Sequence, residues 1–219
     1  MKADIPPPLL RRDCWNGTVK LFPVAGVQYS DGLSLTTMEQ FSDLELVNEV
    51  RNGKRQAFTE LMRRYQERVY WTARRIVGSH DDADDIAQET FVRAYLALGD
   101  FRGDSSFFTW LYRIAVNLSL NAIRKQQVME YLRQSDIINR FLPAQENPEK
   151  DLEREEMHSL VDKAIASLPE KQRAVFVMRY YDEMSYAEIS KVLKTSIGGL
   201  KANYYHAVRK VQEYVKNET

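Results

Sequence analysis

Apolar residues recur at helical spacing along most of the chain, and this pattern predicts an all-α protein. Residues 54–77 keep the period of a long helix, and Gly78 suits a C-terminal cap because glycine readily adopts left-handed backbone angles. A shorter helix comes first, because Ser42 and Glu45 have the spacing of a capping box and the apolar run that follows ends near Gly53. Residues at the ends of both helices therefore predict where each helix begins or ends.

The segment 81–98 combines an apolar stripe with an unusual opposite face. At about 100° per residue, one side of a helix carries the positions that we expect to be buried: Ala83, Ile86, Ala87, Thr90, Phe91, Ala94, Ala97 and Leu98. The opposite face carries Asp85, Gln88, Glu89, Val92, Tyr95 and Leu96, with Asp84 at its edge. Apolar side chains rimmed by charge are typical of a protein-contact surface. An ordinary solvated face with two isolated aliphatic residues is the alternative.

A loop at 99–106 leads into another helix that begins at Phe107. Its expected core stripe consists of Phe107, Trp110, Leu111, Ile114, Leu118 and Ala122. A neighbouring stripe carries the hydrogen-bond donors Arg113, Asn117 and Arg124, with Asn121 close by. Cationic and amide donors beside an aromatic-rich loop suit a single-stranded nucleic acid, whose phosphates need charge and whose bases need rings. A solvated polar face over an aromatic core explains the same pattern, and the sequence leaves both interpretations open.

The helical pattern weakens over residues 126–151, where Pro143 and Pro148 interrupt it, and we expect a flexible linker there. A clean amphipathic helix follows and ends at Leu168, after which Pro169 opens the next helix. A second capping box, with Ser185 at its start, begins a short helix that reaches Leu193. A three-residue turn then leads to a final helix from Ile197 to about Val215. This is the helix-turn-helix arrangement.

The final helix has a basic outer side. Between Ile189 and Gln212 the chain has five basic residues and no acid: Lys191, Lys194, Lys201, Arg209 and Lys210. We expect Ile197, Leu200, Tyr204, Ala207, Val208 and Val211 to pack inward, and Gly198, Lys201, Ala202, Tyr205, His206 and Arg209 to face out. Two glycines in the first turn, Gly198 and Gly199, let the backbone approach a groove closely. The pattern favours DNA contact over a plain bundle helix.

Composition narrows the function classes. The chain has 219 residues with 31 basic and 31 acidic side chains, so a nucleic-acid role requires local clustering of charge. Its single cysteine excludes a disulfide framework and a thiolate zinc site, and its histidines (His80, His158 and His206) lack ligand spacing. We expect neither a metal nor a cofactor. With no apolar run long enough for a membrane span and no signal-peptide pattern, we expect a cytoplasmic protein without membrane insertion.

Residues 1–37 differ from the rest of the chain, because prolines and glycines interrupt every apolar run. We expect either a disordered tail or a mis-assigned start, since Met38 directly precedes the first well-formed helix.

Two sets of motifs carry a family resemblance. Residues 84–91, 101–103 and 109–117 resemble region 2 of a bacterial extracytoplasmic-function (ECF) RNA polymerase sigma factor of the sigma-70 family. Residues 168–170, 185–189 and 196–201 resemble region 4 of the same family. The resemblance implies two small helical domains, at 42–127 and 152–217, joined by a linker at 128–151.

The resemblance also implies three binding sites and a function, which is promoter-specific transcription initiation. Core RNA polymerase would bind Asp84, Asp85, Gln88, Glu89, Val92 and Leu96. The melted −10 strand would bind Phe101, Arg102, Ser105, Phe108, Arg113, Asn117 and Arg124. The −35 duplex would bind Ser196, Gly198, Gly199, Lys201, Ala202, Asn203, Tyr205, His206 and Arg209. The family often has Thr in place of Gly199 and Ser-Arg in place of residues 202–203, so the DNA sequence that this chain prefers is left open. An anti-sigma factor is a further expected partner.

Two other functions compete with this one. A helix-turn-helix regulator that binds only duplex DNA, without core polymerase, is the alternative, and the exposed acidic and apolar face argues against it. A metal-dependent nuclease built on Asp81, Asp82, Asp84 and Asp85 fails on geometry, because consecutive acids on a helix point around it and suit the helix dipole instead. No nucleophile–base pair or phosphate-binding loop is present in the sequence, so we expect no catalytic residues and no enzymatic activity.

Overall fold

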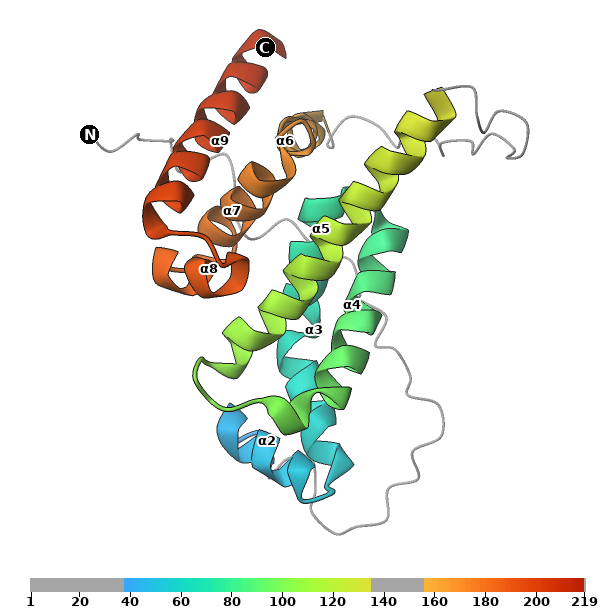
Figure 1. The fold of residues 1–219 in the computed structure, drawn as a ribbon, viewed down its shortest axis with the longest axis vertical. Helices are drawn as coiled ribbons and strands as arrows, with labels where there is room; N and C mark the ends of the chain where they lie inside the picture. Colours follow the sequence, from blue (N-terminus) through green and yellow to red (C-terminus); the bar gives the residue numbers. More distant parts are fainter. Residues whose placement is uncertain (1–37, 135–155, 219) are drawn as a thin grey trace. The chain divides into compact units, whose positions relative to one another are not determined.

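The computed structural model describes residues 38–134 and 156–218, and all regular secondary structure within them is helical, which confirms the all-α class (Figure 1). The expectations for residues 1–37, and for residues 135–151 of the linker, lie outside the described residues. No helix within the described ranges combines the length and apolar composition that a membrane span needs.

The first two helices begin and end at the residues that carry the local signals. Helix α2 (Asp43–Arg51) has a complete capping box, in which the Ser42 side chain accepts from the backbone of Glu45 and the Glu45 side chain accepts from Ser42. Helix α3 (Arg55–Val77) ends at Gly78, whose φ of 87° is left-handed as expected. The predictions for both helices are confirmed.

Helices α4 (His80–Leu96) and α5 (Phe107–Gln134) pack against α3 and against each other, and Figure 1 shows the three running side by side. The short 3₁₀ helix η1 (Leu98–Asp100) follows α4. Helix α5 continues through residues 128–134, where the sequence predicts the start of the linker. Residues 128–134 are thus helical.

The buried stripe of α5 differs from the expected one. Ile114, Leu118 and Ala122 are only half-buried, whereas Tyr112, Val116, Leu120 and Ile123 are buried. The cause is that α5 is covered on a second side, by helices of the C-terminal part of the chain. The expectation of a single stripe therefore fails from the second turn of the helix onward.

The C-terminal part consists of α6 (Glu156–Ala166), α7 (Glu170–Tyr180), α8 (Tyr186–Leu193) and α9 (Ile197–Glu218). The capping box between Ser185 and Glu188 is present at the start of α8. The tight turn into α9 uses a left-handed Lys194, with φ of 50°. Ile197 is 46% exposed, because it lies in the first turn of α9, so the expectation that it packs inward is wrong.

The C-terminal helices pack on α3 and α5 within one compact unit. Arg173 on α7 donates a 2.8 Å hydrogen bond to the carbonyl oxygen of Ile76 at the end of α3. Arg75 on α3 lies 4.0 Å from the ring centroid of Tyr181, a cation–π contact. Both contacts join the C-terminal part of the chain to α3.

Candidate functional site

The outer side of α4 is exposed as its pattern predicts. We call Asp85, Gln88, Glu89, Val92, Tyr95 and Leu96 the α4 face; all six are exposed, and Asp84 at its edge is half-buried. Val92 is 53% exposed and Leu96 is 78% exposed, although aliphatic side chains are usually buried in a protein core. Glu89 forms a 2.6 Å ion pair with Arg93 one turn later. The α4 face is thus an apolar pair set among charges, which suits a protein partner.

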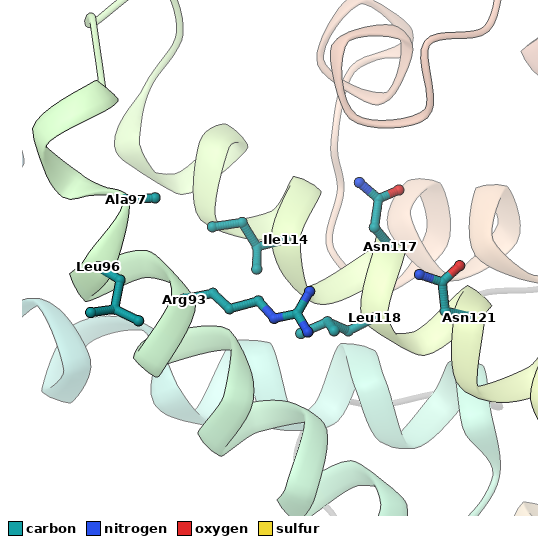
Figure 2. A pocket seen from close by; sticks show the side chains of 7 residues that line it. All are labelled: Arg93, Leu96, Ala97, Ile114, Asn117, Leu118 and Asn121. Atoms are coloured by element: carbon teal, nitrogen blue, oxygen red, sulfur yellow. The ribbon is translucent and has the colours of Figure 1, made fainter.

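A cavity of about 410 Å³ joins this surface to α5 (Figure 2). Its lining comes from Arg93, Leu96, Ala97, Ile114, Asn117, Leu118 and Asn121. Figure 2 shows the Arg93 side chain reaching from α4 toward Leu118, with the amides of Asn117 and Asn121 further along α5. This lining explains why Ile114 and Leu118 are half-buried. An apolar floor edged by amide and guanidinium donors can hold a planar polar group such as a base.

Arg93 was not among the predicted site residues. It lies one turn after Glu89 and two turns after Asp85, so the sequence spacing alone places it on the same side of α4. The cavity itself could not be predicted from the spacing on α4, because its other wall is formed by α5.

The loop between η1 and α5 presents fewer rings than expected. Phe101 is only 5% exposed and packs against Phe107 and Trp110, with ring centroids 5.9 Å and 5.4 Å away. Phe108 is half-buried, and the guanidinium of Arg68 lies 4.1 Å from its ring centroid. In this conformation the Phe101 ring packs against α5 and the Phe108 ring lies under Arg68 of α3, so neither ring is free to stack on a base; their part in strand binding stays a prediction.

The exposed part of the 99–106 loop is polar. Arg102, Gly103 and Asp104 are exposed and Ser105 is half-buried, while Gly103 has a left-handed φ of 77°. At the end of the loop, Ser106 Oγ accepts a 3.2 Å hydrogen bond from the backbone N–H of Thr109 and so caps α5. The loop thus offers a guanidinium and backbone groups to a ligand.

The donors along α5 have different surroundings. Arg113 is half-buried and Asn117 is exposed toward the cavity. Arg124 is exposed and makes a two-pronged ion pair with Glu170 on α7, with N–O distances of 2.8–3.1 Å. The hydrogen bonds that Arg124 donates to the Glu170 carboxylate raise the pKa of Arg124. Arg124 must therefore exchange this partner to reach a phosphate.

The outer side of α9 matches the predicted one. Gly198, Lys201, Ala202, Tyr205, His206 and Arg209 are exposed, as is Ser196 before the helix, whereas Gly199 and Asn203 are half-buried. Leu200, Ala207 and Val208 are buried as expected. Lys201 and Arg209 thus share an exposed surface with the small side chain of Ala202.

The two glycines of α9 have different structural roles. A Cβ on Gly198 would meet nothing within 4 Å, so this position leaves the helix surface open. A Cβ on Gly199 would lie 3.3 Å from Ser196 Oγ, the same atom that accepts a 3.2 Å hydrogen bond from the N–H of Gly199. Gly199 therefore serves the N-terminal cap of α9 as well as its surface.

Comparisons with known proteins cover both parts of the chain. Residues 61–128 match the family sigma-70 region 2, and residues 158–211 match sigma-70 region 4. RNA polymerase sigma-H factor of Pseudomonas aeruginosa is 34% identical over 180 residues, which cover 79% of this chain and 92% of that protein. ECF RNA polymerase sigma-E factor of Escherichia coli K12 is 36% identical over 185 residues, which cover 81% of this chain and 96% of that protein.

Solved structures with the same fold include two complexes. CnrH bound to the cytosolic domain of CnrY aligns with a TM-score of 0.60 at 26% identity, over 81% of this chain and 99% of that one. The sigma factor RpoE of Bartonella quintana, in complex with the anti-sigma factor NepR, aligns with a TM-score of 0.57 at 22% identity, over 73% of this chain and 96% of that one.

Proposed function

We propose that this chain, which belongs to the ECF sigma factors of the sigma-70 family, binds core RNA polymerase and directs it to specific promoters. One observation carries the proposal: the residues that match region 2 and region 4 hold, in that order, an exposed acidic and apolar helix face and an exposed basic helix. These are the surfaces that a protein that joins a polymerase to DNA needs.

The α4 face is the proposed contact with core polymerase. Asp85, Gln88 and Glu89 supply charge and hydrogen-bond acceptors, and Val92 and Leu96 supply apolar area, with Asp84 at the edge. An interface gains affinity mainly from a few central contacts that become fully desolvated. Because these side chains are exposed in the folded chain, a partner can bury them without any change in the packing of α4.

The melted −10 strand is proposed to bind along the 99–106 loop and α5. Arg102 and Ser105 lie in the loop, and Arg113, Asn117 and Arg124 follow along α5. The cavity edged by Asn117 suits a base taken out of the stack. Phe101 packs the end of the loop against Phe107 and Trp110, whereas Phe108 packs against Arg68 and Tyr112, and in this conformation both contribute to strand binding only indirectly.

The −35 duplex is proposed to bind the first turns of α9, where a helix N-terminus enters the major groove. Ser196, Gly198, Gly199, Lys201, Ala202, Asn203, Tyr205, His206 and Arg209 form this surface. Lys201 and Arg209 suit phosphates, whereas Ala202, Asn203 and His206 suit base edges.

Sigma factors act without catalytic groups of their own, and we propose that this chain is likewise no enzyme and works in the cytoplasm, where core polymerase and the chromosome are found. We also propose an anti-sigma factor as a regulating partner, since the aligned RpoE structure is a complex with one.

A run-off transcription assay with purified core polymerase tests the proposal. Wild-type protein should initiate at defined sites, and the double variant Asp85→Lys with Glu89→Lys should lose core binding while it keeps its helicity. Reversal of the same charge at Glu67 and Glu183, which are exposed elsewhere, serves as the control. A protein that binds duplex DNA but never core polymerase would instead support the helix-turn-helix regulator.

A further inference from the structure

The C-terminal end of α2 reaches the 99–106 loop through one side chain. Arg51, the last residue of α2, donates from Nη2 to the carbonyl oxygens of Leu98 at 3.1 Å and Gly99 at 3.4 Å. The same nitrogen also contacts the carbonyl oxygen of Phe101. These three oxygens lie 47–50 residues away in the sequence.

The contact has a clear electrostatic reason. The last carbonyl groups of a helix have no N–H partner within it, and they carry the negative end of the helix dipole. Helix α4 ends at Leu96 and η1 ends at Asp100. Two helix ends therefore follow each other closely, and their last carbonyl groups need hydrogen-bond donors from elsewhere. A guanidinium satisfies such a cluster well, because its donors are numerous and its charge is permanent.

The loop is fixed at its other points as well. The ring of Phe101 is held between Phe107 and Trp110, and Ser106 caps α5. The exposed residues 102–104 therefore lie between two fixed points of the chain, the buried Phe101 and the cap at Ser106. A loop that is held in one shape before its ligand arrives loses less conformational entropy on binding.

We propose that Arg51 is a positioning residue for strand capture: it fixes the base of the 99–106 loop and thereby raises the affinity of the polymerase complex for the melted −10 strand. The inference rests on the proposed function. Arg51 contacts neither the α4 face nor α9 through these bonds, so its removal should leave core binding and −35 binding unchanged.

The test uses reconstituted holoenzyme with Arg51→Met, Arg51→Lys and, as a matched control, Arg55→Met, which replaces an exposed arginine at the start of α3. The probe is a single-stranded oligonucleotide that carries the non-template −10 sequence of a promoter selected by the wild-type holoenzyme. We expect Arg51→Met to lower affinity for this strand about tenfold, because a charged donor to three carbonyl groups is lost. Arg51→Lys should recover part of the loss, and Arg55→Met should have no effect.

Two further measurements separate positioning from a general structural role. Core affinity and duplex −35 affinity of Arg51→Met should equal those of the wild type, and hydrogen exchange should quicken at residues 99–106 alone. Unchanged strand affinity in Arg51→Met overturns the inference, and so does an equal loss of core affinity or exchange that quickens throughout the protein. If the wild-type protein itself fails to bind core polymerase, the proposed function fails first, and the two failures are thus distinguishable.

Discussion

The hydroxyl of Thr72 on α3 donates a 2.9 Å hydrogen bond to Oδ2 of Asp182, in the segment between α7 and α8. The Thr72 oxygen is also hydrogen-bonded to the hydroxyl of Tyr112 on α5, at 3.1 Å. Two parts of the chain, 40 and 110 residues away in the sequence, thus meet at one buried threonine of α3. Removal from water raises the pKa of Asp182 to about 6, and the Thr72 hydrogen bond only partly opposes this shift.

Asp182 should make the stability of the protein depend on pH. Its folded-state pKa of about 6 lies above the ordinary value of 3.8, so between these values the folded state binds more protons than the unfolded state. The free energy of unfolding should therefore fall as pH rises from about 4 to about 6, and this contribution should stay flat above that range. Asp182→Asn keeps an oxygen for Thr72 without the charge, and should stabilise the protein by about 1–3 kcal/mol at pH 7.

Denaturant unfolding of wild type and Asp182→Asn at pH 5 and pH 7 measures this effect. The gap between the two proteins should be larger at pH 7, whereas Glu183→Gln, a change at the exposed neighbouring residue, should produce no gap. A gap that is the same at both pH values would contradict the assignment.

Val92 and Val128 provide a matched pair for the α4 face. Both valines are exposed on a helix, by 53% and 57%, but only Val92 belongs to the α4 face. Val92→Asp should weaken core polymerase binding by about 10- to 30-fold, because an apolar group central to the contact is replaced by a charge. Val128→Asp should leave affinity unchanged, and both variants should unfold at the wild-type temperature. Titration with labelled core enzyme gives the comparison, and equal affinities for the two variants would remove Val92 from the interface.

Features encoded within a few residues could be predicted from the sequence. The caps at Ser42, Gly78 and Ser185 depend on side chains or backbone preferences at fixed short spacing, and all three are present. The exposed side of α4 also follows from helical period alone, since one face of that helix has too few apolar residues to be buried.

Features that depend on distant segments could not be predicted. Tyr112, Val116 and Leu120 are also buried on α5, because α7 and α8 pack on this helix in addition to α3 and α4. Phe101 looks like an exposed loop aromatic in the sequence, and its burial depends on how the chain folds back onto Trp110. No local pattern connects Arg51 to carbonyl groups almost fifty residues away.

The basic residues of α9 should separate affinity from sequence preference. Lys201→Ala should weaken promoter binding by a similar factor on every sequence and lower the salt dependence by about one unit of slope, because one phosphate contact is lost. Lys216→Ala, at the far exposed end of the same helix, should change neither quantity. Changes at Ala202, Asn203 or His206 should instead alter base preference in the −35 element, by about 1–3 kcal/mol per contact. Selection from randomised promoters reads this preference, and one shared preference for all variants would show that α9 is not the reading helix.

Met38 provides the last prediction, which concerns the need for residues 1–37. The side chain of Met38 is 1% exposed, and its carbonyl oxygen accepts hydrogen bonds from Arg64 at 3.2 Å and from the N–H of Phe41 at 3.1 Å. A chain that starts at Met38 keeps all of these contacts, so its free energy of unfolding should lie within about 0.5 kcal/mol of the full chain. Met38→Ala in the full chain should cost about 2–4 kcal/mol, because a buried side chain is truncated.

Run-off transcription then asks whether residues 1–37 contribute to function. The shortened chain should initiate as well as the full one, because the α4 face, the 99–106 loop and α9 all lie in the part that is kept. The Met38→Ala variant serves as a control for stability, since it weakens folding without touching any of these surfaces. A shortened chain that folds with full stability and binds core polymerase, yet fails to initiate, would show that residues 1–37 act during initiation itself.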